Sequence, residues 1–375
     1  MHMQSRLPDK PTTIKTPPFS THTRIHYKGN TMQHPFDPLI IRGKSLIPIV
    51  QGGMGVGISA SSLSSAVARE NGVGTIASVD LRHLHDDLLA ESKINPTEAK
   101  YDKLNRIALD REITKAKADS EGRGMIAVNV MKAVKDHQAL VRQACESGAD
   151  AIVIEHPAHA AGHLGAMTVD GVNDAKFEFK RVIEETFEVF KKLGLEGEKI
   201  PLVLAGGMAN FQKIHTALKE WGASAVQIGT AFAVTHEGDA HINFKKTLAG
   251  ADTEQVVEFM SVAGLPARGV KTKFLESYMK RESVLQANAK ADQRRCTQGI
   301  NCLSVCGLRD GLEKVGQFCI DLKLAAAWRG EVDKGLFFRG KDPLPFGKTL
   351  HSVQETIHYL LSGEMPLVMP LQKQA

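Results

Sequence analysis

The chain has 375 residues, of which 42% are hydrophobic, and a net charge of +5 at pH 7. That length suits two or three average domains, or one barrel of about 250 residues with an appendage. The excess positive charge lies in residues 1–31, where five basic side chains outnumber one acidic side chain, and the remainder is close to neutral. This balance argues against nucleic-acid binding by the folded part, and no run of about 20 apolar residues predicts a membrane span.

Residues 1–36 are basic, contain several prolines and hold no apolar run. We expect them to form a disordered tail, because they offer too little apolar surface to be ordered by burial. The tail lacks the apolar segment of a secretory signal and fits an amphipathic transit peptide poorly.

The first apolar strand is expected at residues 46–50, and it leads into the glycine-rich stretch 51–57. A helix over residues 59–69 follows, capped by one of the serines near its start. A second strand is expected at 74–78. The long polar stretch 93–123 predicts an exposed helix with an even mix of charges.

The middle of the chain continues this alternation of strands and helices. Residues 125–130 predict a third strand, with a helix at 136–147 after it. A fourth strand is expected at 151–154, followed by a loop with three histidines at 155–165 and a helix at 177–193.

Two further apolar strands are predicted at 200–204 and 225–228, joined by a crossover helix at 211–221. Each strand is followed by a small-residue set that can turn backbone N–H groups toward an anion: Gly206 with Gly207, and Gly229 with Thr230. Neighbouring loops of this kind often bind phosphate in (β/α) barrels, although glycine after a strand can also be simple turn punctuation.

Near-continuous apolar strands alternating with helices predict a parallel α/β sheet with both faces covered. The sequence contains six strand and helix units, whereas a closed (β/α) barrel needs eight. Either two strands are hidden in the polar stretches or the chain lacks them.

Six short motifs, in this order, resemble those of one enzyme family. They are residues 51–54, 128–129, 160–165, 205–207, 227–230 and 264–268. The chain is similar to the nitronate monooxygenase family, once called 2-nitropropane dioxygenases, and to the related FMN-dependent enoyl-ACP reductase II enzymes. The resemblance implies a (β/α)8 barrel with a smaller, mostly helical domain, and FMN as the cofactor.

The chain departs from the family pattern in three places. Ala161 replaces a glycine, and His156 replaces a family-typical glutamine. The chain also passes directly from the third helix to the histidine loop, where the family has two more strands. We therefore expect a TIM-type (β/α) barrel that lacks about two strand–helix units after residue 150. Unpaired strand edges at such a gap favour association, so a homodimer is one expectation.

We expect three regions in the chain. Residues 1–36 form the tail, residues 37–250 form the FMN-binding barrel, and residues 251–375 form a mainly helical cap that contributes to substrate binding.

The resemblance implies that His163 is the catalytic residue. An imidazole near neutrality can remove the proton alpha to a nitro group, or orient an anionic nitronate against the flavin. A capping or core histidine is the alternative. His156, His159 and His163 have helical spacing, but Pro157 and Gly162 indicate a loop, so we expect no metal site.

The resemblance also implies a set of flavin-binding residues. Met54 can pack against the flavin ring, with a core-filling role as the alternative. Asn129 is a polar residue at the end of an apolar strand and would be costly to bury without a ligand. The full set is Gly53, Met54, Asn129, His156, Gly162, Gly206, Gly207, Gln227, Gly229 and Thr230.

Three cysteines, Cys296, Cys302 and Cys306, lie close together in the sequence, with Cys319 nearby. Their spacing suggests an iron–sulfur cluster but matches no standard pattern, and reduced thiols in the cap are the alternative. Cysteines without a secretory signal indicate a reducing, cytoplasmic location.

The leading functional hypothesis is FMN-dependent oxidation of nitronates or nitroalkanes by dioxygen. An NAD(P)H-dependent reductase of an enoyl thioester or quinone is the first alternative, and an inactive barrel remnant with weak or no flavin binding is the second. Arg268 could bind an anionic group or form a structural ion pair. The expected partners are a small-molecule substrate and dioxygen, with no nucleic acid and no membrane.

Overall fold

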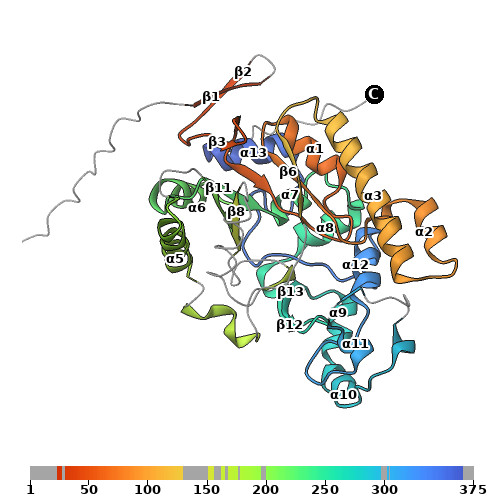
Figure 1. The fold of residues 1–375 in the computed structure, drawn as a ribbon. Coiled ribbons are helices and arrows are strands. Elements are labelled where there is room, and N and C mark those ends of the chain that lie inside the picture. Colours follow the sequence, from red (N-terminus) through yellow and green to blue (C-terminus); the bar gives the residue numbers. More distant parts are fainter. Residues whose placement is uncertain are drawn as a thin grey trace, which may run out of the picture.

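A parallel sheet of six strands forms the centre of the molecule (Figure 1). The computed structural model describes residues 23–27, 30–129, 151–155, 162–164, 168–175, 178–195, 200–296, 302–303 and 305–365. The strands are β5 (Ile49–Gln51), β6 (Val73–Ala77), β7 (Met125–Asn129), β8 (Ile152–Glu155), β10 (Leu202–Ala205) and β11 (Ala225–Ile228). They occupy the six positions that the sequence predicts, so the predicted strands are confirmed.

The order of the strands shows which part of a barrel this sheet represents. The order is β7-β6-β5-β11-β10-β8, so the last strand, β11, pairs with the first, β5. The two edges of the sheet are therefore β7 and β8, which are consecutive strands of the chain. Val128 on β7 and Val153 on β8 are 37% and 49% exposed. In the described residues the sheet is an open portion of a (β/α) barrel, and its six strands agree with the number of strand–helix units counted in the sequence.

Helices follow the strands of this sheet and cover them. They are α1 (Ser61–Arg69), α2 (Asp86–Ser92), α3 (Glu98–Asp119), α5 (Phe179–Lys192), α6 (Phe211–His215), which continues as the π-helical turn η4 (Thr216–Glu220), α7 (Thr230–Ala233) and α8 (Ile242–Gly250). The predicted polar helix is confirmed as α3, which begins where the Thr97 side chain accepts the N–H of Lys100. Its buried residues include Leu104 and Ala108, which form the apolar face.

The start of α1 differs from the prediction that a local serine caps it. The Asp239 carboxylate accepts the backbone N–H groups of Ala60, Ser62 and Leu63 at 2.9–3.0 Å. Ser59 instead accepts the N–H of Met54 through Oγ at 2.8 Å. The cap of α1 therefore comes from the loop after α7, far along the chain, where no local pattern could indicate it.

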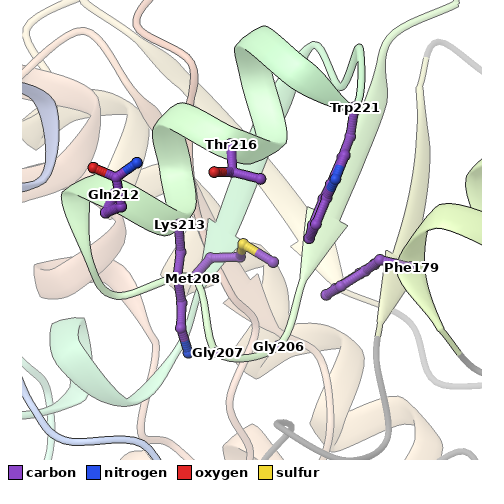
Figure 2. A pocket seen from close by; sticks show the side chains of 8 residues that line it. All are labelled: Phe179, Gly206, Gly207, Met208, Gln212, Lys213, Thr216 and Trp221. Carbon is purple, nitrogen blue, oxygen red and sulfur yellow. The ribbon is translucent and has the colours of Figure 1, made fainter. Parts of the chain in front are cut away.

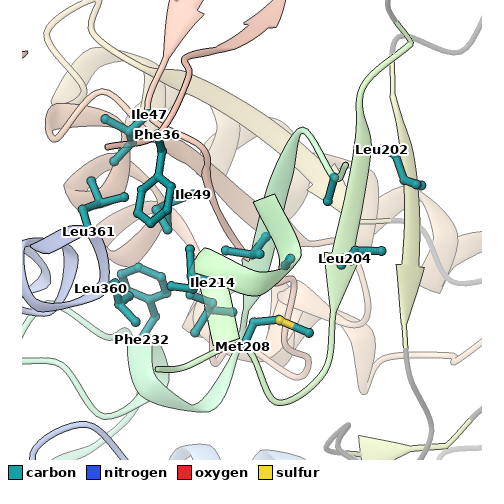
Figure 3. Close-up of a cluster of buried hydrophobic side chains, with 14 of the residues drawn as sticks. Phe36, Ile47, Ile49, Leu202, Leu204, Met208, Ile214, Phe232, Leu360 and Leu361 are labelled. Atoms are coloured by element: carbon teal, nitrogen blue, oxygen red, sulfur yellow. The ribbon is translucent and has the colours of Figure 1, made fainter. Parts of the chain in front are cut away.

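The main hydrophobic core lies between the sheet and its helices, and Figure 3 shows part of it. Phe36, Ile49 and Leu204 are almost fully buried there. The last helix, α13 (Val353–Ser362), contributes Leu360 and Leu361 to the same core. This helix thus packs on the barrel, although residues 251–375 were expected to form a separate cap.

Short strands precede the sheet. β1 (Thr23–Tyr27) and β2 (Asn30–His34) form an antiparallel hairpin, and β3 (Leu39–Ile41) pairs with β4 (Lys44–Leu46). The last part of the expected tail is therefore structured, and buried Phe36 shows that the folded part begins before residue 37.

The second module is built on a small antiparallel sheet of β12 (Val256–Met260), β13 (Pro266–Val270) and β9 (Gly162–His163), where β13 is the middle strand. Around it lie α9 (Lys273–Met279), α10 (Glu282–Ala287), α11 (Gly307–Asp310) and α12 (Ile320–Trp328). Its own core includes Phe259, Tyr278 and Phe318. None of the helices in the described residues is long and apolar enough to cross a membrane.

Candidate active site

The two predicted phosphate loops lie side by side at the carboxyl edge of the sheet. Strands β10 and β11 are parallel, with Ala205 opposite Gln227, so the residues after them meet at one level. Gly206 and Gly207 have φ angles of +98° and +70°, a backbone conformation that residues other than glycine rarely adopt. The backbone conformation itself therefore requires glycine at these two positions.

Three strand ends converge on the predicted flavin ring site. A Cβ atom added to Gly53, after β5, would lie 2.3 Å from Asn129 Cβ, at the end of β7. A Cβ added to Gly229, after β11, would lie 3.5 Å from the sulfur of Met54. A Cβ added to the neighbouring Gly52 would lie 3.5 Å from the Gln227 side chain. The structure thus brings five predicted residues to one place: Gly53, Met54, Asn129, Gln227 and Gly229.

Thr230 begins the short helix α7 and is held from the far end of the chain. Its Oγ1 accepts the N–H of Gly340 at 3.2 Å. The neighbouring Arg339 is 3% exposed and donates through Nε to the carbonyl of Leu248 at 2.9 Å. These two hydrogen bonds hold residues 339 and 340 beside Thr230.

His163 lies on β9 of the second module, whereas the sequence indicates a loop. It pairs with Ala267 of β13, and its Nε2 lies 2.8 Å from the hydroxyl of Ser261. The ring centroid lies 5.9 Å from that of Phe338. Burial lowers the pKa of His163 from its ordinary value, so the imidazole is neutral at physiological pH.

Gly162 and Phe338 connect this histidine to the phosphate loops. Gly162 has a φ angle of +72°, and a Cβ added to it would lie 3.4 Å from the Phe338 ring. Phe338 itself precedes the segment that bonds to Thr230. His163 and the phosphate loops are therefore tied to one short stretch of chain, residues 338–340.

A pocket of about 180 Å³ lies beside Gly206 and Gly207, and Figure 2 shows the side chains around it. Phe179 and Trp221 form one wall, with ring centroids 5.7 Å apart. Its remaining lining residues are Met208, Gln212, Lys213 and Thr216. Its lining is mostly apolar, and the Lys213 ammonium is paired with Asp342 at 2.6 Å.

Two other predicted residues have different outcomes. Arg268 is buried at 1% exposure and pairs with Glu258, with Nη2 2.6 Å from Oε1. The structure thus shows the ion pair that was one of its two expected roles. His156 lies outside the described residues.

Two cysteines of the second module, Cys302 and Cys306, are free thiols. Burial, followed by the neighbouring Asp321 carboxylate, raises the pKa of Cys302 to about 12, although the residue keeps an exposed surface. Among the residues that the structure describes, the group whose ligand atoms lie close enough for one metal ion is Asp80, His83 and Asp321, not the thiols. Arg82 pairs with Asp80 at 2.8 Å, so we interpret this group as a buried ion-pair network.

Sequence reasoning missed Ser261, Phe338 and Gly340. Ser261 lies three residues before the motif at 264–268, and nothing in its local sequence links it to His163 about a hundred residues earlier. Phe338 and Gly340 lie in a stretch to which the sequence assigned no role. Only the pairing of β9 with β13 and the hydrogen bond to Thr230 reveal them.

Comparison with known proteins supports the family resemblance. The family model "Nitronate monooxygenase" matches residues 105–362, and the chain therefore belongs to that family. The nitronate monooxygenase of Pseudomonas aeruginosa is 32% identical over 148 residues, and the probable nitronate monooxygenase of Bacillus subtilis is 28% identical over 131 residues. These matches cover 40% and 35% of this chain, but only 38% and 35% of the two relatives.

Two solved structures resemble this chain at low sequence identity. FabK from Thermotoga maritima has a TM-score of 0.47 at 20% identity, covering 84% of this chain and 91% of that one. The nitroalkane oxidase from Streptomyces ansochromogenes has a TM-score of 0.48 at 18% identity, covering 84% and 94%.

Proposed function

We propose that this chain is an FMN-dependent oxidoreductase that oxidises nitronates with dioxygen. The observation that carries the proposal is the pair of loops after β10 and β11, where Gly206 and Gly207 adopt positive φ angles beside Gly229. Loops of this geometry can approach a phosphate closely and direct N–H groups toward it. Membership of the nitronate monooxygenase family supports the choice of substrate.

The residues present fit a flavin mononucleotide. Gly206, Gly207, Gly229 and Thr230 would hold its phosphate, and Gly53, Met54 and Asn129 would lie beside its ring. When bound, FMN supplies the redox chemistry, since it can take electrons from a nitronate and pass them to dioxygen. Asn129 would then have a hydrogen-bond partner in the flavin, and the bare backbone at Gly53 leaves room for the ring.

His163 is the residue proposed to act on the substrate. Its imidazole is neutral because burial lowers its pKa, so it can act as a base or as an uncharged hydrogen-bond group. Phe338 packs on one side of the ring and helps to exclude water from it.

Flavin content and oxygen consumption test the proposal. The purified chain should be yellow or take up added FMN, and propyl nitronate should stimulate oxygen uptake. His163→Ala should keep the flavin and lose most of this activity, on the order of a hundredfold, as is typical for a proton-transfer or orienting residue. The open edge of the sheet favours one competing hypothesis, an inactive remnant, and a colourless protein that ignores added FMN would support that alternative.

An iron–sulfur cluster at Cys296, Cys302 and Cys306 is a separate hypothesis. The high pKa of Cys302 disfavours the thiolate that a cluster needs, unless the metal itself displaces the proton. Iron and acid-labile sulfide should be measured on protein purified without oxygen. The absence of both would remove the cluster from the account.

We further propose that the protein is a cytoplasmic homodimer. The free thiols of Cys302 and Cys306 fit a reducing compartment. In the described sheet, the edge strands β7 and β8 each pair with one neighbour, and each carries an exposed valine. Light scattering on the purified chain should give the mass of a dimer, and the mass of a single chain at all concentrations would contradict this assembly.

A further inference from the structure

The hydrogen bonds around Ser261 determine which nitrogen of His163 carries its proton. Ser261 is fully buried, and its hydroxyl oxygen accepts the N–H of Ala263 at 3.1 Å. The same hydroxyl lies 2.8 Å from His163 Nε2. No hydrogen bond within the described part of the chain engages the other ring nitrogen, Nδ1.

A serine hydroxyl has one proton to donate and two lone pairs. Since the Ala263 N–H uses one lone pair, the hydroxyl proton still needs an acceptor. His163 Nε2 is the acceptor that the described residues provide for it. Donation from the hydroxyl to Nε2 requires that Nε2 be unprotonated, so in a neutral imidazole the proton is on Nδ1.

The opposite arrangement is less favourable. If Nε2–H donated to the serine oxygen, that oxygen would accept two hydrogen bonds and the serine proton would be buried without a partner. An unsatisfied buried donor is disfavoured enough to shift a tautomer ratio by roughly ten- to a hundredfold. The proton therefore belongs on Nδ1.

We infer that Ser261 is a positioning residue that fixes the Nδ1–H tautomer of His163, so that His163 is a hydrogen-bond donor to an anion and not a base. This inference rests on the proposed function and specifies the role of His163 in it. A nitronate is already an anion and gains a hydrogen bond from Nδ1–H. A neutral nitroalkane needs a base, and the fixed tautomer offers it none, so the chain should prefer nitronates.

The tautomer can be observed directly in the wild-type chain. Nitrogen NMR of the full-length protein labelled with ¹⁵N-histidine, with the signals of His163 assigned from His163→Gln, separates protonated from unprotonated ring nitrogens. At neutral pH we expect Nδ1 to be protonated and Nε2 to be unprotonated, with and without added FMN. A protonated Nε2, alone or in an imidazolium, would overturn the inference.

The donor role is tested with nitrate, a planar anion that resembles the nitro end of a nitronate and cannot be oxidised. Nitrate should shift the Nδ1 signal of the wild-type chain and should shift it less in Ser261→Ala. A Nδ1 signal that nitrate leaves unchanged would contradict the donor role. Neither measurement depends on turnover. Failure to oxidise nitronates would therefore refute the proposed function, whereas the NMR result alone decides the tautomer.

Variants give a kinetic test. In Ser261→Ala the tautomer ratio should move toward Nε2–H, and kcat/KM for propyl nitronate should fall about three- to tenfold, while that for the neutral nitroalkane falls less. Ser261→Thr keeps the hydroxyl, so its tautomer ratio and its kcat/KM for propyl nitronate should stay close to the wild-type values. This variant tests the role of the hydroxyl even if the alanine variant folds poorly. Ser62→Ala, at an exposed serine, is the matched control. Equal losses for both substrates, or an unchanged tautomer ratio, would contradict the role of Ser261.

Discussion

Gly53 shows how a single residue can shape this site. The Cβ of an alanine there would lie 2.3 Å from the Cβ of Asn129, so one of the two strand ends must move. Overpacking of this kind typically lowers the free energy of unfolding by about 1–3 kcal/mol. We expect Gly53→Ala to lower the melting temperature and to weaken FMN binding, measured by quenching of flavin fluorescence.

Gly250→Ala is the control for this substitution. Gly250 lies in α8, has open space around it and does not have a positive φ angle. It should leave both FMN affinity and stability unchanged or slightly improved. Equal flavin affinity in wild type and Gly53→Ala would show that the flavin does not lie against the Gly53–Asn129 contact.

Thr230 should recognise the phosphate of the cofactor and not its ring. Its hydroxyl accepts the N–H of Gly340 and can donate its own proton to a phosphate oxygen. Hydrogen bonds to charged groups contribute about 1.5–3 kcal/mol, so Thr230→Val should weaken FMN binding by roughly tenfold or more. Riboflavin, which has no phosphate, should bind both forms equally. Thr247→Val is the control, at a half-buried threonine of α8 whose hydroxyl donates to the Asn243 carbonyl in the same helix. An equal loss for riboflavin would contradict a phosphate contact.

At the scale of elements, a buried ion-pair network joins the turn after β6 to helix α12. His83 Nε2 lies 3.2 Å from Asp321 and 3.5 Å from Asp80. Burial alone would lower the pKa of His83, but the hydrogen bonds to Asp321 and Asp80 outweigh it and raise this pKa to about 9. The folded protein therefore keeps His83 protonated at neutral pH.

This network makes stability depend on pH in a predictable direction. The folded pKa of His83 lies above the unfolded value of about 6.5, so its stabilisation is complete below that pH and is lost as pH rises through about 9. The urea midpoint should fall between pH 7 and pH 10, and His83→Gln should flatten that decline. His358→Gln on α13 is the control. A decline of the same size in His83→Gln would contradict the assignment.

Local pattern in the sequence predicts the elements well but not the contacts between distant ones. The six strands and α3 follow from apolar runs and charge pattern, and the strands lie where expected. By contrast, His163 lies in a two-residue strand, β9, that exists only because β13 pairs with it. The glycine loops were predictable because each follows its own strand, whereas the Ser261 contact spans 98 residues and the Asp239 cap spans 179.

At the scale of the whole molecule, the open sheet edge is the feature that most separates this chain from a closed barrel. Edge strands promote association, and Val153 of β8 is half exposed. A lysine there should disfavour an edge-to-edge contact, so Val153→Lys should raise the dissociation constant of a dimer at least tenfold in light-scattering dilution series. Val284→Lys, at a valine of α10 that is 62% exposed, is the control. An unchanged dimer in Val153→Lys would place the interface elsewhere.

The open side of the sheet also affects whether the protein can bind a flavin and a substrate. The strand ends that gather Gly53, Asn129, Gly206 and Gly229 all belong to the part that is present. In the described sheet, β7 and β8 are the edge strands, and the β11–β5 junction lies at the centre. The proposed phosphate loops therefore follow strands that are paired on both sides, and the open side is where a substrate would be less enclosed.

Anaerobic stopped-flow spectroscopy of the FMN-loaded chain tests the central claim most directly. We predict that propyl nitronate bleaches the flavin absorbance rapidly and that admitted air restores it, while NAD(P)H reduces the flavin slowly or not at all. Rapid bleaching by NAD(P)H with no reduction by propyl nitronate would contradict the account and identify a reductase instead.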